Sequence, residues 1–158
     1  MKKTLLRLGE LVCIVLLGVF ITFVCLRDSV SSEPFESVEA AVTEAALIEG
    51  LTQRDSLEIK KKLSLEGEDY IDFVCYSGDT VMDVRELMLF KVADANAVNA
   101  VSDRVGEYIS EKISIFEGYA PEESSMLSAH LLIGKKGYVL FYVGDEQEAV
   151  AAAFSESL

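Results

Sequence analysis

The sequence predicts an α+β protein with an N-terminal transmembrane helix. After the helix we expect a small domain with a roughly four-stranded, largely antiparallel sheet packed by helices. Two observations support this. Residues 11–26 form an uncharged apolar run, and Lys2, Lys3 and Arg7 precede it. Beyond it, two pairs of β-prone segments are each followed by an amphipathic helix that begins near an aspartate, which predicts two ββα-like units.

The apolar run decides where the rest of the chain lies. A spanning helix needs about 20 mostly apolar residues, and residues 4–26 supply that length. Basic residues before the helix keep the amino terminus in the cytoplasm, so everything after it is expected to be extracytoplasmic at the cell membrane. The alternative is a cleaved secretory signal, which has the same basic start and apolar core. We therefore divide the chain into an anchor or signal (1–27), a linker (28–34) and an extracytoplasmic domain (35–158).

The amino-acid composition limits the kinds of partner that the chain can bind. The chain of 158 residues has a formal net charge of −13, a field that repels nucleic acid and anionic lipid, so we expect no nucleic acid partner. Cys75 is the one cysteine of the predicted domain and has no internal disulfide partner. Because it falls in an apolar run, we expect it to be buried like a small hydrophobic residue.

The first half of the domain predicts two helices and two strands. Apolar residues at helical spacing indicate a helix over residues 35–49, and Asp55 with Glu58 forms a capping box for a short helix ending at Leu63. In that helix the run of three lysines at residues 60–62 is expected to face solvent. Residues 70–76 and 86–92 are rich in aromatic and branched side chains, which is typical of strands.

The second half repeats the scheme. Asp94 can cap a long helix reaching about residue 117, with Tyr108, Lys112 and other residues on its core-facing stripe. Strands are expected at 128–133 and 138–143, joined by a hairpin at 134–137. Asp145 with Glu148 predicts the cap of a last helix. The similar strand ends at 90–94 and 141–145 favour a sheet with helices on one face.

These segments resemble a known family. They are ELMLFKV before a long helix, then residues 119–121 (YAP), then 137–141 (GYVLF) and a helix ending in Ala153 and Phe154. They are similar to membrane-anchored or lipoprotein-type extracytoplasmic domains of unknown function from Gram-positive anaerobic bacteria. The similarity extends over roughly residues 40–156, although this chain lacks the lipoprotein cysteine. It implies an envelope domain, and the family has no established catalytic residues to transfer.

No motif for catalysis, a cofactor or a metal is present, so we predict no catalytic, cofactor-binding or metal-binding residues. The single histidine, His130, lies in the predicted strand 128–133 and is expected to be structural. Acidic residues form three groups, and we expect all three to be solvated surface: Glu66, Glu68, Asp69 and Asp72; Asp79, Asp83 and Glu86; Glu122 and Glu123.

Four tyrosines are the candidate binding surface: Tyr70, Tyr76, Tyr138 and Tyr142. If helices cover only the other face of the sheet, these rings form an exposed patch. The alternative is that they pack beneath the helices at 35–49 and 55–63. The leading hypothesis is a membrane-tethered domain that binds a partner protein or ligand without chemistry. The alternatives are a cell-envelope enzyme that uses acidic residues and a structural subunit of an envelope complex.

Overall fold

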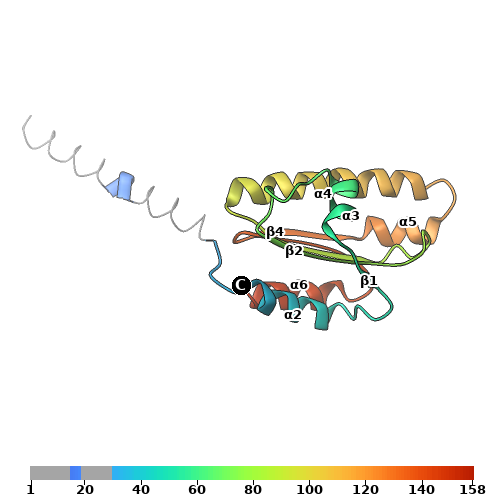
Figure 1. Cartoon of the computed structure of the whole chain (residues 1–158), viewed down its shortest axis with the longest axis horizontal. Helices are drawn as coiled ribbons and strands as arrows, with labels where there is room; N and C mark the ends of the chain where they lie inside the picture. Colours follow the sequence, from blue (N-terminus) through green and yellow to red (C-terminus); the bar gives the residue numbers. More distant parts are fainter. Residues whose placement is uncertain (1–14, 19–29) are drawn as a thin grey trace, which may run out of the picture.

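The computed structural model describes residues 15–18 and 30–158, and the α+β prediction is confirmed. A single sheet lies between two layers of helices (Figure 1). Helices α3 (Ser56–Leu63), α4 (Ala95–Phe116) and α5 (Pro121–Ser128) cover one face. Helices α2 (Phe35–Ala45) and α6 (Gln147–Glu156) cover the other.

The sheet has five strands, all antiparallel, in the order β1-β2-β3-β5-β4. The strands are β1 (Thr52–Gln53), β2 (Asp72–Ser77), β3 (Glu86–Lys91), β4 (Leu131–Lys135) and β5 (Tyr138–Val143). We expected four strands, and the prediction was wrong because it missed the edge strand β1. With two residues, this strand is too short to show the alternation that identifies a strand in sequence.

Helices on both faces correct the expectation of a one-sided sheet. Along β3, Met88 and Phe90 pack with α3 and α4, whereas Leu87 and Leu89 pack with α2 and α6. All six residues of β5 are buried. A strand covered on both faces needs apolar residues at every position, and this explains why these central strands are continuous apolar runs.

The predicted helix starts had mixed outcomes. Asp55 and Asp94 cap α3 and α4 as expected, since each carboxylate accepts hydrogen bonds from two backbone N–H groups. Asp145 does not cap α6, which begins after Glu146 without a side-chain cap. Helix α5 was not predicted, although Pro121 at its first position and two glutamates in its first turn are typical of a helix start.

The hairpin between β4 and β5 is confirmed. Its turn residues Lys136 and Gly137 both have positive φ angles, 51° and 81°, which is the geometry of a type I′ turn. His130 lies in the turn before β4 and not within a strand. Its ring is partly exposed, and Nδ1 lies 2.8 Å from the Leu127 carbonyl oxygen.

The domain begins beside its own C-terminus. The Ser31 hydroxyl donates to the Leu158 carbonyl, and the Ser31 backbone N–H donates to Lys136 in the hairpin turn. The register places this turn at the Lys91 end of β3, so the β2–β3 loop (78–85) lies at the opposite end of the sheet (Figure 1). Within the part of the chain that the structure describes, no helix is long and apolar enough to cross a membrane. Apart from residues 15–18, the expected anchor lies outside that part.

Candidate functional site

The four tyrosines do not share an exposed surface. Tyr138 and Tyr142 are buried beneath α2 and α6, where their hydroxyls donate to the carbonyls of Glu33 and Ala46. Tyr76 is half-buried on the same side. Tyr70 packs on the opposite face, with its ring 5.1 Å from that of Phe73.

Most of the acidic groups lie at the surface, as expected, but Glu86 does not. Asp79 is exposed and pairs with Arg54, and Glu66 pairs with Lys60. Over residues 15–18 and 30–158, no three metal-ligating side chains come together in a group that could hold an ion. Glu86, in contrast, has 0% of its side chain exposed.

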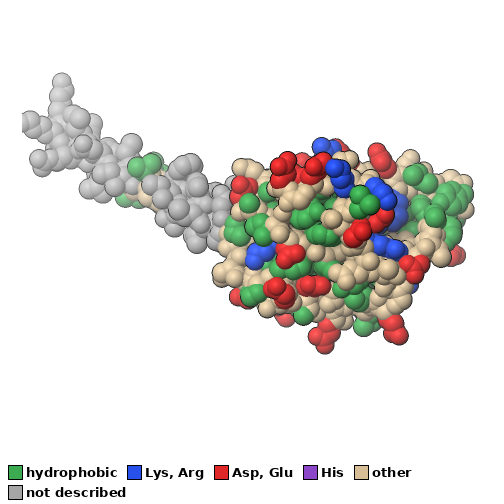
Figure 2. Space-filling view, in the orientation of Figure 1, with side chains coloured by type: hydrophobic (Ala, Val, Ile, Leu, Met, Phe, Trp, Pro, Cys, Tyr) green, Lys and Arg blue, Asp and Glu red, His purple; other side chains and the backbone are tan. Residues whose placement is uncertain are grey.

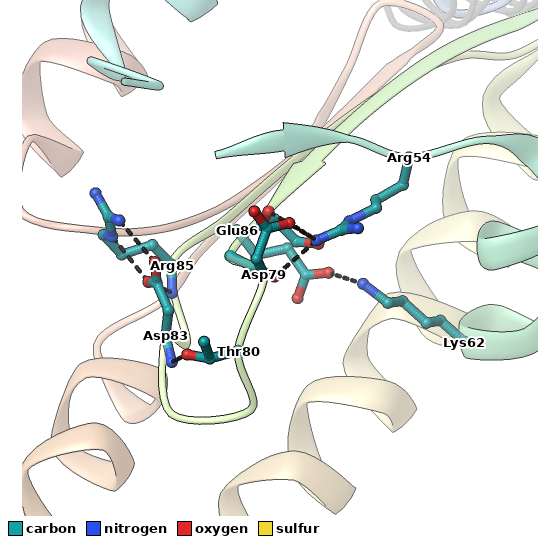
Figure 3. A network of polar contacts seen from close by, with 9 residues as sticks. Arg54, Lys62, Asp79, Thr80, Asp83, Arg85 and Glu86 are labelled. Carbon is teal, nitrogen blue, oxygen red and sulfur yellow. Dashed lines mark hydrogen bonds and ion pairs between the residues drawn. The ribbon is translucent and has the colours of Figure 1, made fainter. Parts of the chain in front are cut away.

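The Glu86 carboxylate accepts from three donors, and we call these four side chains the Glu86 cluster. Lys62 of α3 donates to Oε1 at 2.6 Å. On the other oxygen, Oε2, Tyr108 donates at 2.7 Å and Lys112 at 3.1 Å, both from α4. Figure 3 shows the Lys62 side chain extending from α3 to this carboxylate. A buried carboxylate is tolerated when its oxygens are hydrogen-bonded and its charge is balanced, and both conditions are met here.

Two positions in the sequence indicate this cluster. Lys112 falls on the apolar stripe of α4, and Glu86 is the first residue of an apolar strand. A cation and an anion that both sit at core positions indicate a buried pair. The expectation that residues 60–62 face solvent was wrong for Lys62, which has 22% of its side chain exposed.

Beside the cluster lies a hollow of about 340 Å³, which we call the Glu86 hollow. Its walls come from α3, the end of β2 with the following loop, and the second half of α4. Lys62, Tyr108 and Lys112 line it, and so do Val81 and Phe116. The three donors of the buried carboxylate therefore also face the solvent-filled space.

Two arginines fix the loop that forms one wall (Figure 3). The Arg54 guanidinium donates to the Ser77 hydroxyl at 2.9 Å, the Gly78 carbonyl at 2.8 Å and the Asp79 carboxylate at 2.9 Å. The Arg85 guanidinium donates to both carboxylate oxygens of Asp83, at 2.8 and 2.6 Å. These bonds lower the pKa of the Asp83 carboxyl group.

The Glu86 cluster carries a surplus of one positive charge, and the other charged groups near the hollow are paired. Asp79 and Asp83 pair with Arg54 and Arg85, and Glu58 pairs with Lys61. Lys62 and Lys112, however, share the single carboxylate of Glu86. Figure 2 shows blue side chains gathered around α3 on a face where red ones are widely scattered. A local positive surplus in a chain of net charge −13 favours an anion in this hollow.

Tyr108 and Cys75, two ionisable groups close to Glu86, are held protonated. Burial, and then the charge of Glu86, raise the pKa of the Tyr108 phenol, so it acts as a hydrogen-bond donor. The same two causes raise the pKa of the Cys75 thiol to about 12. Cys75 is fully buried, as predicted. Tyr108 therefore acts as a fixed hydrogen-bond donor in the wall of the hollow.

A second hollow, of about 350 Å³, lies between the first half of α4 and the segment 64–71. We call it the alanine hollow because Ala93, Ala97 and Ala100 line it together with Tyr70. Its charged residues, Glu68, Asp69 and Arg104, are exposed. We favour the Glu86 hollow as the functional site, although it is no larger, because Lys62 and Lys112 in its wall are largely buried and held in place by Glu86.

Comparison with known sequences gives a family. Residues 44–144 match the domain of unknown function DUF4358. The chain belongs to this family. No curated protein and no solved structure matches the chain. All members of the Glu86 cluster lie inside the DUF4358 match. The resemblance to an uncharacterised family is thus confirmed, while the membrane anchor and the bacterial source that it implied stay predictions.

Proposed function

We propose that this DUF4358 protein is a membrane-tethered extracytoplasmic binding domain that holds the acidic group of a ligand or partner protein in the Glu86 hollow. One observation carries the proposal. Two ammonium groups, of Lys62 and Lys112, converge on one buried carboxylate at the wall of an open hollow. Partly buried charges attract an oppositely charged ligand more strongly than exposed ones, because water screens them less.

The position of the hollow suits a tethered domain. The described part of the domain starts at the end of the sheet where Ser31 bonds the hairpin turn. The hollow lies at the other end of β3, a separation of about 17 Å at 3.4 Å per residue. A tether through residues 4–26 would then leave the hollow facing away from the membrane and open to a partner.

Binding has more support than catalysis. A cell-envelope enzyme acting through acidic residues needs carboxyl groups that are free to exchange protons. Here Asp79 and Asp83 are each held by an arginine, and Glu86 is enclosed by three donors. A structural subunit of an envelope complex would also need a surface that contacts a partner protein. The experiment below therefore tests this alternative as well.

Site-directed photocrosslinking in native membranes tests the proposal. A photoreactive phenylalanine analogue replaces Val81, whose side chain is 77% exposed and lines the hollow. The matched control replaces Leu47, which is 66% exposed on the loop after α2. We expect a defined adduct from position 81 that is lost when Lys112→Gln is added, and none from position 47. Equal adducts from both positions, or an adduct at 81 that is indifferent to Lys112→Gln, would contradict the proposal.

A further inference from the structure

We infer that the group accepted by the Glu86 hollow is a single carboxylate carried on a short apolar body. This inference rests on the proposed function and specifies its ligand. Three features lead to it: the charge balance of the Glu86 cluster, the unused donors of its two ammonium groups and the apolar part of the hollow's wall.

The charge balance favours a monoanion. Lys62 and Lys112 share the single carboxylate of Glu86, so the Glu86 cluster has one uncompensated positive charge. One carboxylate neutralises it. A phosphate dianion would add a net negative charge beside the exposed Asp79, which also lines the hollow. Repulsion between the second negative charge and the Asp79 carboxylate disfavours the dianion.

The two ammonium groups keep donors that Glu86 does not use. Lys62 and Lys112 bond opposite oxygens of Glu86, and both line the hollow. Each ammonium has three N–H donors, and the bond to Glu86 occupies one of them. About a fifth of each side chain is exposed, 22% for Lys62 and 20% for Lys112. The remaining donors can therefore bond a second carboxylate from the side of the hollow.

The apolar part of the wall accounts for the body of the ligand. Val81 and Phe116 line the hollow, and Met82 and Ile115, their neighbours in sequence, are exposed. Figure 2 shows hydrophobic side chains gathered at the end of the molecule where α4 leads into α5. An exposed apolar group next to fixed cations matches a ligand in which a carboxylate adjoins a hydrocarbon or an apolar side chain.

Two sources present this chemistry: a free short-chain acid and the C-terminal carboxylate of a peptide. Isothermal titration of the full-length chain in a mild detergent distinguishes them. The small probes are 4-methylpentanoate, its neutral amide and inorganic phosphate. The peptide probes are an acetylated tripeptide ending in leucine, with a free or an amidated C-terminus. The amides control for partition into detergent.

We expect both carboxylates to bind and both amides to bind at least about tenfold more weakly, because each loses its charge-assisted hydrogen bonds. Tighter binding of the peptide acid than of 4-methylpentanoate assigns the site to peptide C-termini, and the reverse order assigns it to free acids. Either order supports the inference. Equal binding of each acid and its amide would overturn it.

Substitutions in and near the Glu86 cluster test where the carboxylate binds. Lys112→Gln should weaken the carboxylate by about tenfold, the size expected for one charged hydrogen bond, and Lys60→Gln on the outer face of α3 should not change it. Glu86→Gln should tighten it, because both ammonium groups become free for the ligand. A purely structural role of the cluster does not predict tightening. Circular dichroism verifies folding, and the Glu86→Gln and amide comparisons stand if Lys112→Gln fails to fold.

The outcomes separate the inference from the proposed function. Phosphate binding that is tighter than carboxylate binding and depends on Lys112 would overturn the carboxylate assignment and leave the anion site intact. Carboxylate binding that is indifferent to Lys112→Gln and Glu86→Gln would overturn both.

Discussion

Lys62 Nζ lies 2.6 Å from Glu86 Oε1, and this contact joins helix α3 to the first residue of the central strand β3. With Lys112 and Tyr108 on the other oxygen, one carboxylate ties together three elements that are far apart in sequence. A buried ionic cluster of this kind is often no more stabilising than well-packed apolar residues. Our hypothesis is therefore that its charges serve the adjacent hollow, and the predictions below separate stability from binding.

Removing one donor should cost stability. Lys62→Met leaves the buried Glu86 carboxylate with two of its three partners, and we expect the free energy of unfolding to fall by about 1–3 kcal/mol. Lys60→Met, two residues earlier on the exposed side of α3, should change it by no more than about 0.5 kcal/mol. Urea unfolding measures both. Equal effects of the two substitutions would show that the Lys62 contact contributes nothing specific.

Alkaline pH should remove the contribution of the Cys75 thiol to the free energy of unfolding. Its folded-state pKa of about 12 lies above the unfolded value near 9, so the folded state keeps its proton where the unfolded state has lost it. The stabilisation is complete below pH 9 and is lost between pH 9 and 12. The stability difference between wild type and Cys75→Ala should shrink by about 1.4 kcal/mol from pH 8 to pH 10. Urea titrations with reductant at both pH values test this, and a constant difference would refute it.

Gly78 should tolerate no side chain. A Cβ there would lie 2.5 Å from the Asp83 Cβ and 2.7 Å from the Asp83 carbonyl oxygen. Gly78→Ala must displace the loop that walls the hollow, with an expected loss of about 1–3 kcal/mol and weaker ligand binding. In the matched control Gly106→Ala, the new Cβ meets nothing within 4 Å inside α4. That substitution should stabilise the helix by about 0.5–1 kcal/mol. A Gly78→Ala protein as stable as the wild type would contradict the packing described.

The tether makes a prediction about topology. We expect external protease to degrade the domain from about residue 35 on intact cells, and the washed membrane fraction to retain the full-length chain. Protection from external protease would place the domain on the other side of the membrane. Recovery of a soluble chain that starts near residue 31 would indicate a cleaved signal in place of an anchor.

Some local signals in the sequence predicted local structure, whereas the expected cap at Asp145 was wrong and helix α5 was not predicted. Asp55 and Asp94 cap the helices they precede, and the chain turns at residues 136 and 137, within the predicted segment 134–137. Each of these features depends on a few neighbouring residues. The layer arrangement was misjudged because the five-residue echo suggested one face, whereas the unbroken apolar runs of β3 and β5 already indicated two.

The candidate site could not be predicted from sequence spacing. Lys62, Glu86 and Lys112 are separated by 24 and 26 residues, and no spacing rule relates them. Only the packing of α3 and α4 on the same face of β3 brings their side chains together. The tyrosines were misleading for a related reason: whether a ring on a strand is exposed depends on which helices cover it.

The most direct test of the central claim is to map the bound carboxylate. The backbone amide NMR spectrum of the full-length chain is recorded in detergent with and without 4-methylpentanoate. We predict that the largest shifts fall in residues 78–84 and in α4 from Tyr108 to Phe116, around the Glu86 hollow. Largest shifts around Ala97, Ala100 and Tyr70, in the alanine hollow, would contradict the assignment of the site.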